Sequence, residues 1–198
     1  MKAGKSVTER IDLPLYEIFY KMNKDLLISN LRTVPDYPVK GILFFDVTTM
    51  FKNRKCFEEI VNSIYDLYKD KGITKVAGIE SRGFVVGAAV AAKLGVGFVP
   101  VRKPGKLPSK TVRESYFKEY GEDKIEMHID AIEPDDVVLV HDDILATGGT
   151  ASAAVRLVKQ FQPKAVYANF IIDIIDIPRS CPIPSDVEVT SLLQLGEK

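Results

Sequence analysis

The chain has 198 residues, 46% of them hydrophobic, which suits one α/β domain with a sizeable core. Its 27 basic and 27 acidic residues balance to a formal net charge of zero, which argues against a nucleic-acid-binding or membrane-surface protein. No apolar run approaches the ~20 residues of a membrane-spanning helix. The first residues are unlike a secretory signal, and Cys56 and Cys181 stand far apart, as isolated thiols in a reducing compartment do. We therefore expect a soluble, cytoplasmic protein that binds neither nucleic acid nor membranes.

The N-terminal part predicts two helices. Residues 1–22 are interpreted as an N-terminal extension, in which Leu13–Met22 has apolar residues at helical spacing. The main domain is placed at residues 23–198. Its first segment, Asn23–Val34, predicts a second helix that Pro35 ends.

Residues 35–48 form a loop punctuated by Pro and Gly that leads into the apolar segment Ile42–Phe45. Taken alone, this pattern indicates a surface loop followed by an edge strand. Residues 53–71 then carry apolar side chains at the spacing of a long amphipathic helix. Core packing is a sufficient explanation for that helix.

Two polar segments follow predicted strands. Lys75–Glu80 predicts a strand, and Ser81-Arg82-Gly83 follows it just before a helix over 84–94. Ligands bind at the carboxyl ends of strands in open α/β sheets, and a helix N-terminus favours anions. Val96–Val101 predicts the next strand, which is followed within five residues by three bases, Arg102, Lys103 and Lys106. By itself, such a basic cluster is usually a solvated loop.

Residues 109–128 alternate enough to predict a β-hairpin, with Glu119 near its middle. By its position alone, Glu119 is interpreted as a surface residue. Neither His128 nor His141 has cysteine or acidic partners at metal-ligand spacing, and His141 is interpreted as a packed or hydrogen-bonded strand residue.

The most informative stretch runs from Val137 to Ala151. A buried apolar strand, Val137–Val140, leads to the acids Asp142 and Asp143, and a Gly-rich turn then enters a helix that has a Thr available near its start. Backbone N–H groups and the helix dipole make the turn an anion site. It is neither a Walker loop nor a dinucleotide-binding fingerprint. The acids would repel a phosphate but suit ribose hydroxyls or a magnesium ion, so we expect a sugar whose 5-phosphate lies in the turn.

The segment Asp142–Thr150 resembles the phosphoribosyl-pyrophosphate (PRPP) binding motif of type I phosphoribosyltransferases, in the adenine phosphoribosyltransferase form. Further resemblance extends from about Asn23 to Gln194. It implies an α/β fold with a mostly parallel twisted sheet flanked by helices, a flap hairpin and a small base-binding hood. It also implies transfer of the 5-phosphoribosyl group of PRPP to adenine, giving AMP and pyrophosphate, by a cytoplasmic homodimer. Mg²⁺ would bind mainly with PRPP or pyrophosphate, without a dedicated protein metal site.

Site residues follow from the same resemblance. Those implied for PRPP are Ser81, Arg82, Arg102, Lys103, Lys106, Asp142, Asp143, Ala146, Thr147, Gly148, Gly149 and Thr150. Those implied for adenine are Leu43, Phe44, Phe45 and Ile174, with Phe44 stacking on the base. Arg82 and Glu119 are the predicted catalytic residues, Arg82 on the pyrophosphate and Glu119 in the flap as the proton handler. In the family, the turn before Ser81 often contains a cis peptide.

Two departures from the family pattern keep alternatives open. Phe45 stands where arginine is commoner, and residues 177–183 differ from the family's usual sequence. One alternative is therefore an enzyme of the same class that acts on hypoxanthine, guanine or xanthine. The other is a non-catalytic PRPP sensor, although the N-terminal extension is too short and too balanced in charge for a DNA-binding domain.

Overall fold

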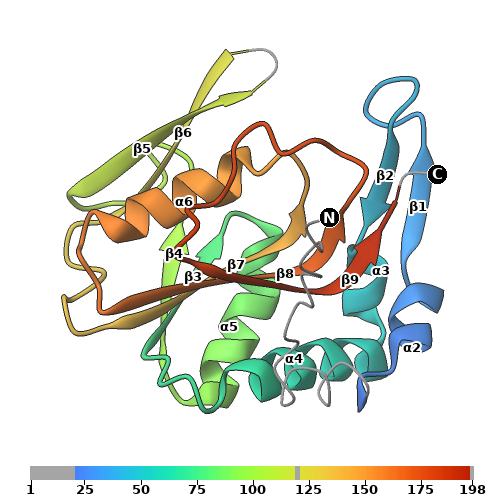
Figure 1. Cartoon of the computed structure of the whole chain (residues 1–198), viewed down its shortest axis with the longest axis horizontal. Coiled ribbons are helices and arrows are strands. Elements are labelled where there is room, and N and C mark those ends of the chain that lie inside the picture. The colour runs from blue at the N-terminus through green and yellow to red at the C-terminus, as the bar shows by residue number, and fades with distance from the viewer. Residues whose placement is uncertain (1–20, 119–120, 197–198) are drawn as a thin grey trace, which may run out of the picture.

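The computed structural model describes residues 21–118 and 121–196. Its centre is a five-stranded sheet in the order β4-β3-β7-β8-β9, in which every neighbouring pair is parallel (Figure 1). The strands of this sheet are β3 (Lys75–Ile79), β4 (Gly97–Val101), β7 (Val137–Leu145), β8 (Ala165–Ile174) and β9 (Glu188–Leu195). The predicted parallel sheet is confirmed.

Helices cover both faces of the sheet. Helices α4 (Arg54–Tyr68) and α5 (Arg82–Leu94) pack on one face, and α6 (Gly149–Lys159) packs on the other (Figure 1). The central strand β7 therefore sends Leu139 into one core cluster and Val138 and Val140 into the other, all with no exposed surface. This burial on both sides explains why the strand begins with an unbroken apolar run.

A hairpin of β5 (Thr111–Lys118) and β6 (Gly121–His128) lies beyond α6 (Figure 1). It is the hairpin predicted for residues 109–128, and its ladder pairs Thr111 with His128 and continues to Lys118 and Gly121. The apolar side of the hairpin, including Tyr116, Ile125 and Met127, joins the core cluster under α6.

The predicted hood comprises α2 (Lys24–Ser29), β1 (Arg32–Pro35), β2 (Leu43–Asp46) and α3 (Thr48–Lys52). The expectation of one helix over Asn23–Val34 is wrong, because α2 ends at Ser29 and the chain then becomes a strand. The Asn30 side chain donates to the Leu26 carbonyl oxygen at 2.9 Å, which satisfies an acceptor at the helix end. Thr33 and Val34 are β-branched and pair with Phe45 and Phe44, so pairing overrides helical spacing here.

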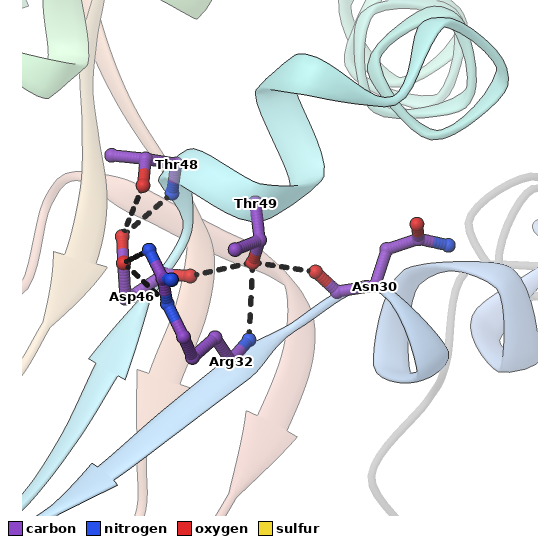
Figure 2. Close-up of polar contacts among 5 residues, drawn as sticks. All are labelled: Asn30, Arg32, Asp46, Thr48 and Thr49. Atoms are coloured by element: carbon purple, nitrogen blue, oxygen red, sulfur yellow. Dashed lines mark hydrogen bonds and ion pairs between the residues drawn. The ribbon is translucent and has the colours of Figure 1, made fainter.

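A polar cluster holds the elements of the hood together (Figure 2). The Asp46 carboxylate accepts from the Thr48 hydroxyl at 2.6 Å and from Arg32 Nη2 at 2.5 Å. The Thr49 hydroxyl donates to the Asn30 carbonyl oxygen at 2.7 Å and accepts from the Arg32 backbone N–H at 3.1 Å. The hydrogen bond from Thr48, followed by the one from Arg32, lowers the pKa of Asp46 to about 2 against its burial. The cluster therefore ties β1, β2 and α3 together through one charged group.

Other boundaries differ from the sequence expectations. Strand β7 continues to Leu145, so Asp142 and Asp143 lie within the strand rather than after it, and β9 has no counterpart in the expectations. Gly148, not a threonine, caps α6, without a side-chain hydrogen bond. The predicted helix over Leu13–Met22 lies outside the described residues except for its end, where Met22 is buried in the core. Among the described helices, none has the length and apolar character to span a membrane.

Candidate functional site

A pocket of about 340 Å³ opens at the carboxyl ends of β7 and β8, beneath the hood. It brings together twelve of the predicted site residues: Leu43, Phe44, Phe45, Arg82, Asp142, Asp143, Ala146, Thr147, Gly148, Gly149, Thr150 and Ile174. Its wall thus combines aromatic and apolar side chains, two acids and a Gly-rich turn. This position matches the ligand crevice of open α/β sheets.

The turn Ala146–Thr150 owes its shape to Gly148. This residue has φ +85°, which side chains disfavour, and a Cβ here would clash with the carbonyl oxygen of Cys181. The Gly148 carbonyl oxygen accepts from the Ser152 N–H at 2.8 Å, which starts α6. The turn therefore places free helix N–H groups and the positive end of the helix dipole at the pocket, where an anion would bind.

The two acids have different surroundings. Asp143 is buried, with 5% of its side chain exposed, and its Oδ2 lies 2.5 Å from Nε of Arg82 in an ion pair. Asp142 is half-buried and accepts from the Asp143 N–H at 2.9 Å. Burial, followed by the neighbouring Asp143 charge, raises the pKa of Asp142 well above its ordinary value. Negative charge at Asp142 is therefore costly until a positive or hydrogen-bonding ligand offsets it.

The hood supplies the aromatic wall. The Arg82 guanidinium lies over the Phe44 ring, 5.5 Å from its centroid, and Tyr37 packs edge-on against the same ring at 5.1 Å. Phe45 is only 4% exposed and belongs to the main core cluster. Because its ring is buried in the core, Phe45 can offer a ligand in the pocket its backbone groups more readily than its ring.

The turn after β3 approaches β7 closely. The Glu80–Ser81 peptide is cis, as the family resemblance implied, and α5 begins directly after Ser81. A Cβ at Gly83 would lie 2.7 Å from the His141 carbonyl oxygen, so only glycine allows the start of α5 to pack against β7. This close approach is what brings Arg82 to Asp143.

Two cations of the loop after β4, Arg102 and Lys103, are already paired with carboxylates. Glu80 accepts from Arg102 Nη2 at 3.0 Å and from the Lys103 backbone N–H at 3.0 Å, and the Lys103 ammonium pairs with Asp123 of the hairpin. Lys103 also lines a second pocket of about 160 Å³ together with Asp142 and Thr150. Ser81, Arg102 and Lys106 are not among the residues that line these two pockets. Lys106 is exposed, and its carbonyl oxygen accepts from Arg102 at 3.0 Å.

The comparisons with known proteins agree on one family. A model of the phosphoribosyl transferase domain matches residues 46–175. An adenine phosphoribosyltransferase of Bacteroides thetaiotaomicron is 55% identical over 174 residues, which are 88% of this chain and 99% of the relative. The chain belongs to the phosphoribosyltransferase family.

Solved structures of the family share the fold. The crystal structure of adenine phosphoribosyltransferase from Rhodothermus marinus is 44% identical, with a TM-score of 0.81 over 91% of this chain and 99% of that one. The Giardia lamblia enzyme, solved in complex with 9-deazaadenine, is 37% identical, with a TM-score of 0.80 over 85% of this chain and 96% of that one.

Sequence reasoning missed several parts of this phosphoribosyltransferase site. Ile177, in the segment that departs from the family pattern, lines the larger pocket, and Glu80 holds the basic loop. An apolar residue in an irregular segment and an acid at a strand end carry no distinctive sequence signal.

His141 is buried, with Nδ1 3.2 Å from Asn169 Oδ1, and burial lowers its pKa to about 4. Glu119 lies outside the described residues, so its role stays a prediction.

Proposed function

We propose that this protein transfers the 5-phosphoribosyl group of PRPP to N9 of adenine, giving AMP and pyrophosphate, as a step of purine salvage. The observation that carries the proposal is the meeting of three kinds of group in the larger pocket. An aromatic and apolar wall suits a base, two carboxylates suit ribose hydroxyls, and the turn at the start of α6 suits a 5-phosphate. The family and the names of the relatives agree with it.

The reaction forms a bond between N9 and C1 of the ribose while the bond from C1 to the pyrophosphate oxygen breaks. The configuration at C1 inverts, the bonding electrons leave with pyrophosphate, and N9 gives up its proton. Positive charge develops at C1 as in other glycosyl transfers. The carboxylates of Asp142 and Asp143 favour that charge and hold the hydroxyls, and the turn fixes the remote phosphate, so that its binding energy orients C1.

The base would lie between the Phe44 ring and Ile174, with the main chain of Leu43 and Phe45 at its edge. Arg82 links the ribose and base parts of the proposed site, because it forms an ion pair with Asp143 and its guanidinium lies over the Phe44 ring. Lys103 lines the smaller pocket together with Asp142, and we assign it to the leaving pyrophosphate. We assign acceptance of the N9 proton, or its polarisation, to Glu119 of the flap, whose closure would keep water from C1.

Magnesium fits the donors in this pocket. Asp142 and Asp143 offer carboxylate oxygens, the ligands that Mg²⁺ prefers, and buried Oδ2 of Asp143 receives no hydrogen bond besides its ion pair with Arg82. Within residues 21–118 and 121–196, no group of three or more His, Cys, Asp or Glu side chains is arranged to hold a metal ion. The rest of the coordination shell would come from PRPP and water. When bound, the ion offsets negative charge on the pyrophosphate.

The test is pyrophosphate release and AMP formation with PRPP, Mg²⁺ and each purine in turn. We expect turnover with adenine and a loss of roughly 100-fold in kcat for Glu119→Ala. Glu58→Ala, which removes an exposed acid paired with Arg54 on α4, is the matched control and should leave turnover unchanged. Turnover only with an oxopurine would show that this base, and not adenine, is the substrate. Binding of PRPP without turnover of any base would favour the sensor alternative.

We also infer that the active protein is a homodimer of the cytoplasm, on the strength of the family resemblance. Light scattering should then give about twice the 22.0 kDa of one chain. A mass of 22.0 kDa under assay conditions that support turnover would refute the dimer without affecting the proposed reaction.

A further inference from the structure

Residues 177–182, which we call the strap, cross the outer side of the phosphate turn. The strap leaves the end of β8, and Ile177 at its start lines the larger pocket. At its far end, the carbonyl oxygen of Pro182 accepts from the Ser152 hydroxyl of α6 at 3.0 Å. The strap is thus fastened to the pocket wall and to the helix that begins at the turn.

Two strap residues donate hydrogen bonds to carbonyl oxygens, one in the turn and one just before it. Arg179 Nη1 donates to the Leu145 carbonyl oxygen at 3.3 Å, and the Cys181 N–H donates to the Thr147 carbonyl oxygen at 3.2 Å. The carbonyl oxygen of Cys181 lies so close to Gly148 that a Cβ there would clash. Arg179 is itself held by an ion pair with Asp173, the residue that pairs with Leu145 across the sheet.

Peptide geometry converts these contacts into an effect on the inner side of the turn. In a trans peptide, the C=O of one residue and the N–H of the next point in opposite directions. A strap that holds the Leu145 and Thr147 carbonyls outward therefore turns the N–H groups of Ala146 and Gly148 away from the strap. Ala146 and Gly148 line the pocket on that inner side, where a phosphate would accept from their N–H groups.

We infer that Arg179 is a positioning residue for the 5-phosphate: it touches no substrate but fixes the turn whose N–H groups bind the phosphate. The inference rests on the proposed function only in its choice of ligand, a ribose 5-phosphate ester. It assigns a role to the segment that departs most from the family pattern, and it separates phosphate binding from base binding.

The experiment compares the affinities of AMP and adenosine by calorimetry, because their ratio reports the phosphate contacts alone. For Arg179→Ala, we expect AMP to bind roughly tenfold more weakly and adenosine to change less than about twofold. In turnover, KM for PRPP should rise roughly tenfold, with KM for adenine and kcat within about twofold. Arg179→Lys keeps one donor and should recover part of the loss. Arg54→Ala, an exposed ion-paired arginine on α4, is the matched control.

If Arg179→Ala fails to fold because Asp173 loses its partner, the double variant Arg179→Met with Asp173→Asn removes the donors without leaving an unpaired charge. It should lose the preference for AMP to the same extent. An unchanged preference in a folded variant, or an equal loss of adenosine affinity, overturns the inference. Wild-type protein that prefers AMP but turns over no base would refute the transferase alone, whereas wild-type protein without that preference overturns both.

Discussion

The two anion-binding regions of this protein are built from different materials. The turn Ala146–Thr150 is held chiefly by main-chain hydrogen bonds and by the left-handed Gly148, whose carbonyl oxygen accepts from Ser152 at 2.8 Å, and Arg179 adds one side-chain donor at the Leu145 carbonyl oxygen just before it. The loop after β4 is held instead by charged side chains. Glu80 accepts from Arg102 at 3.0 Å, and Lys103 pairs with Asp123 of the hairpin.

The turn is a preformed site, because its groups are organised before any ligand binds. The loop is a compensated site, because carboxylates of the protein pair with cations that a ligand would need. The turn presents its N–H groups without any change of partner, so a 5-phosphate meets a site that is already organised. Arg102 and Lys103 of the loop are neutralised by carboxylates, so a pyrophosphate must compete for them. Substitutions in the turn should therefore disrupt phosphate binding by changing the backbone conformation. Substitutions in the loop should change pyrophosphate binding by smaller factors that depend on salt concentration.

The largest effect is expected at Gly148. In Gly148→Ala, the new Cβ meets both an unfavourable φ of +85° and the Cys181 carbonyl oxygen, so the turn cannot keep its shape. We expect kcat/KM to fall more than 100-fold, because the 5-phosphate loses its N–H donors. Urea unfolding should show a loss of about 3 kcal/mol.

Gly72→Ala is the control for Gly148→Ala. Gly72 has φ +70°, but a Cβ there would meet no atom within 4 Å. It should cost only about 1 kcal/mol of stability and leave turnover unchanged. Equal stability losses in the two variants would show that φ alone, and not the contact with Cys181, decides the cost at Gly148.

A smaller effect is expected at Asp142, where a substitution should lower activity but raise stability. Because the pKa of this carboxyl is raised, its charge at pH 7 opposes folding, and the stability gained by protonation is lost as pH rises through the raised pKa. Asp142→Asn should therefore stabilise the protein at pH 7, while kcat/KM falls roughly 100-fold through loss of charge near C1.

Thermal unfolding at pH 7 and pH 4 would check the prediction for Asp142. The stabilisation should shrink toward pH 4, because the raised pKa favours protonation of the wild-type carboxyl as pH falls. Asp70→Asn, an exposed acid just beyond α4, should change neither stability nor turnover. A destabilised Asp142→Asn at pH 7 would mean that the carboxylate makes compensating contacts in the ligand-free protein.

The compensated loop should respond more gently. Lys103→Ala should raise KM for PRPP roughly tenfold, since one charge-assisted contact is lost.

Asp123→Asn should lower the inhibition constant of pyrophosphate about threefold, because Lys103 no longer has a carboxylate partner while the amide oxygen still accepts from Tyr116. The gain should disappear in ~1 M salt. Weaker pyrophosphate inhibition in Asp123→Asn would instead make the ion pair a support for the loop.

The turn was also the part of the site that the sequence predicted best. Its apolar strand, its glycines and the helix after them are local patterns, so a single stretch defines them. The pairing of Glu80 with Arg102, and of Lys103 with Asp123, joins residues about twenty positions apart, and spacing alone cannot indicate such partners. The loop's cations were therefore predicted as ligands, without the carboxylates that hold them.

The fold shows the same division. The parallel sheet follows from apolar runs separated by helical spacing, whereas the end of α2 at Ser29 depends on pairing between β1 and β2. The strap could not be foreseen, because its role rests on the carbonyl groups it meets and not on its own side-chain pattern. Local rules thus predicted elements, and the contacts between elements had to come from the structure.

The smallest effect concerns the hood, which is also held by charge. The Thr48 hydroxyl, followed by Arg32, lowers the pKa of Asp46 from 3.8 to about 2, so the carboxylate stabilises the fold above the ordinary pKa. That stability is lost as pH falls through about 2. Asp46→Asn should therefore cost about 1 kcal/mol at pH 7 and almost nothing near pH 2. KM for adenine should rise about twofold, because β2 carries Phe44.

Urea unfolding at both pH values, with hydrogen exchange on β1 and β2, would measure the contribution of Asp46. Asp66→Asn is the control, because its ion pair with Lys69 is exposed on α4 and should contribute little at either pH. Exchange in the variant should quicken in the hood and not in the turn Ala146–Thr150, since Asp46 takes no part in the contacts that hold the turn. Equal loosening of both regions would mean that the hood and the phosphate turn open as one unit, and the contrast between charge-held and backbone-held regions would fail.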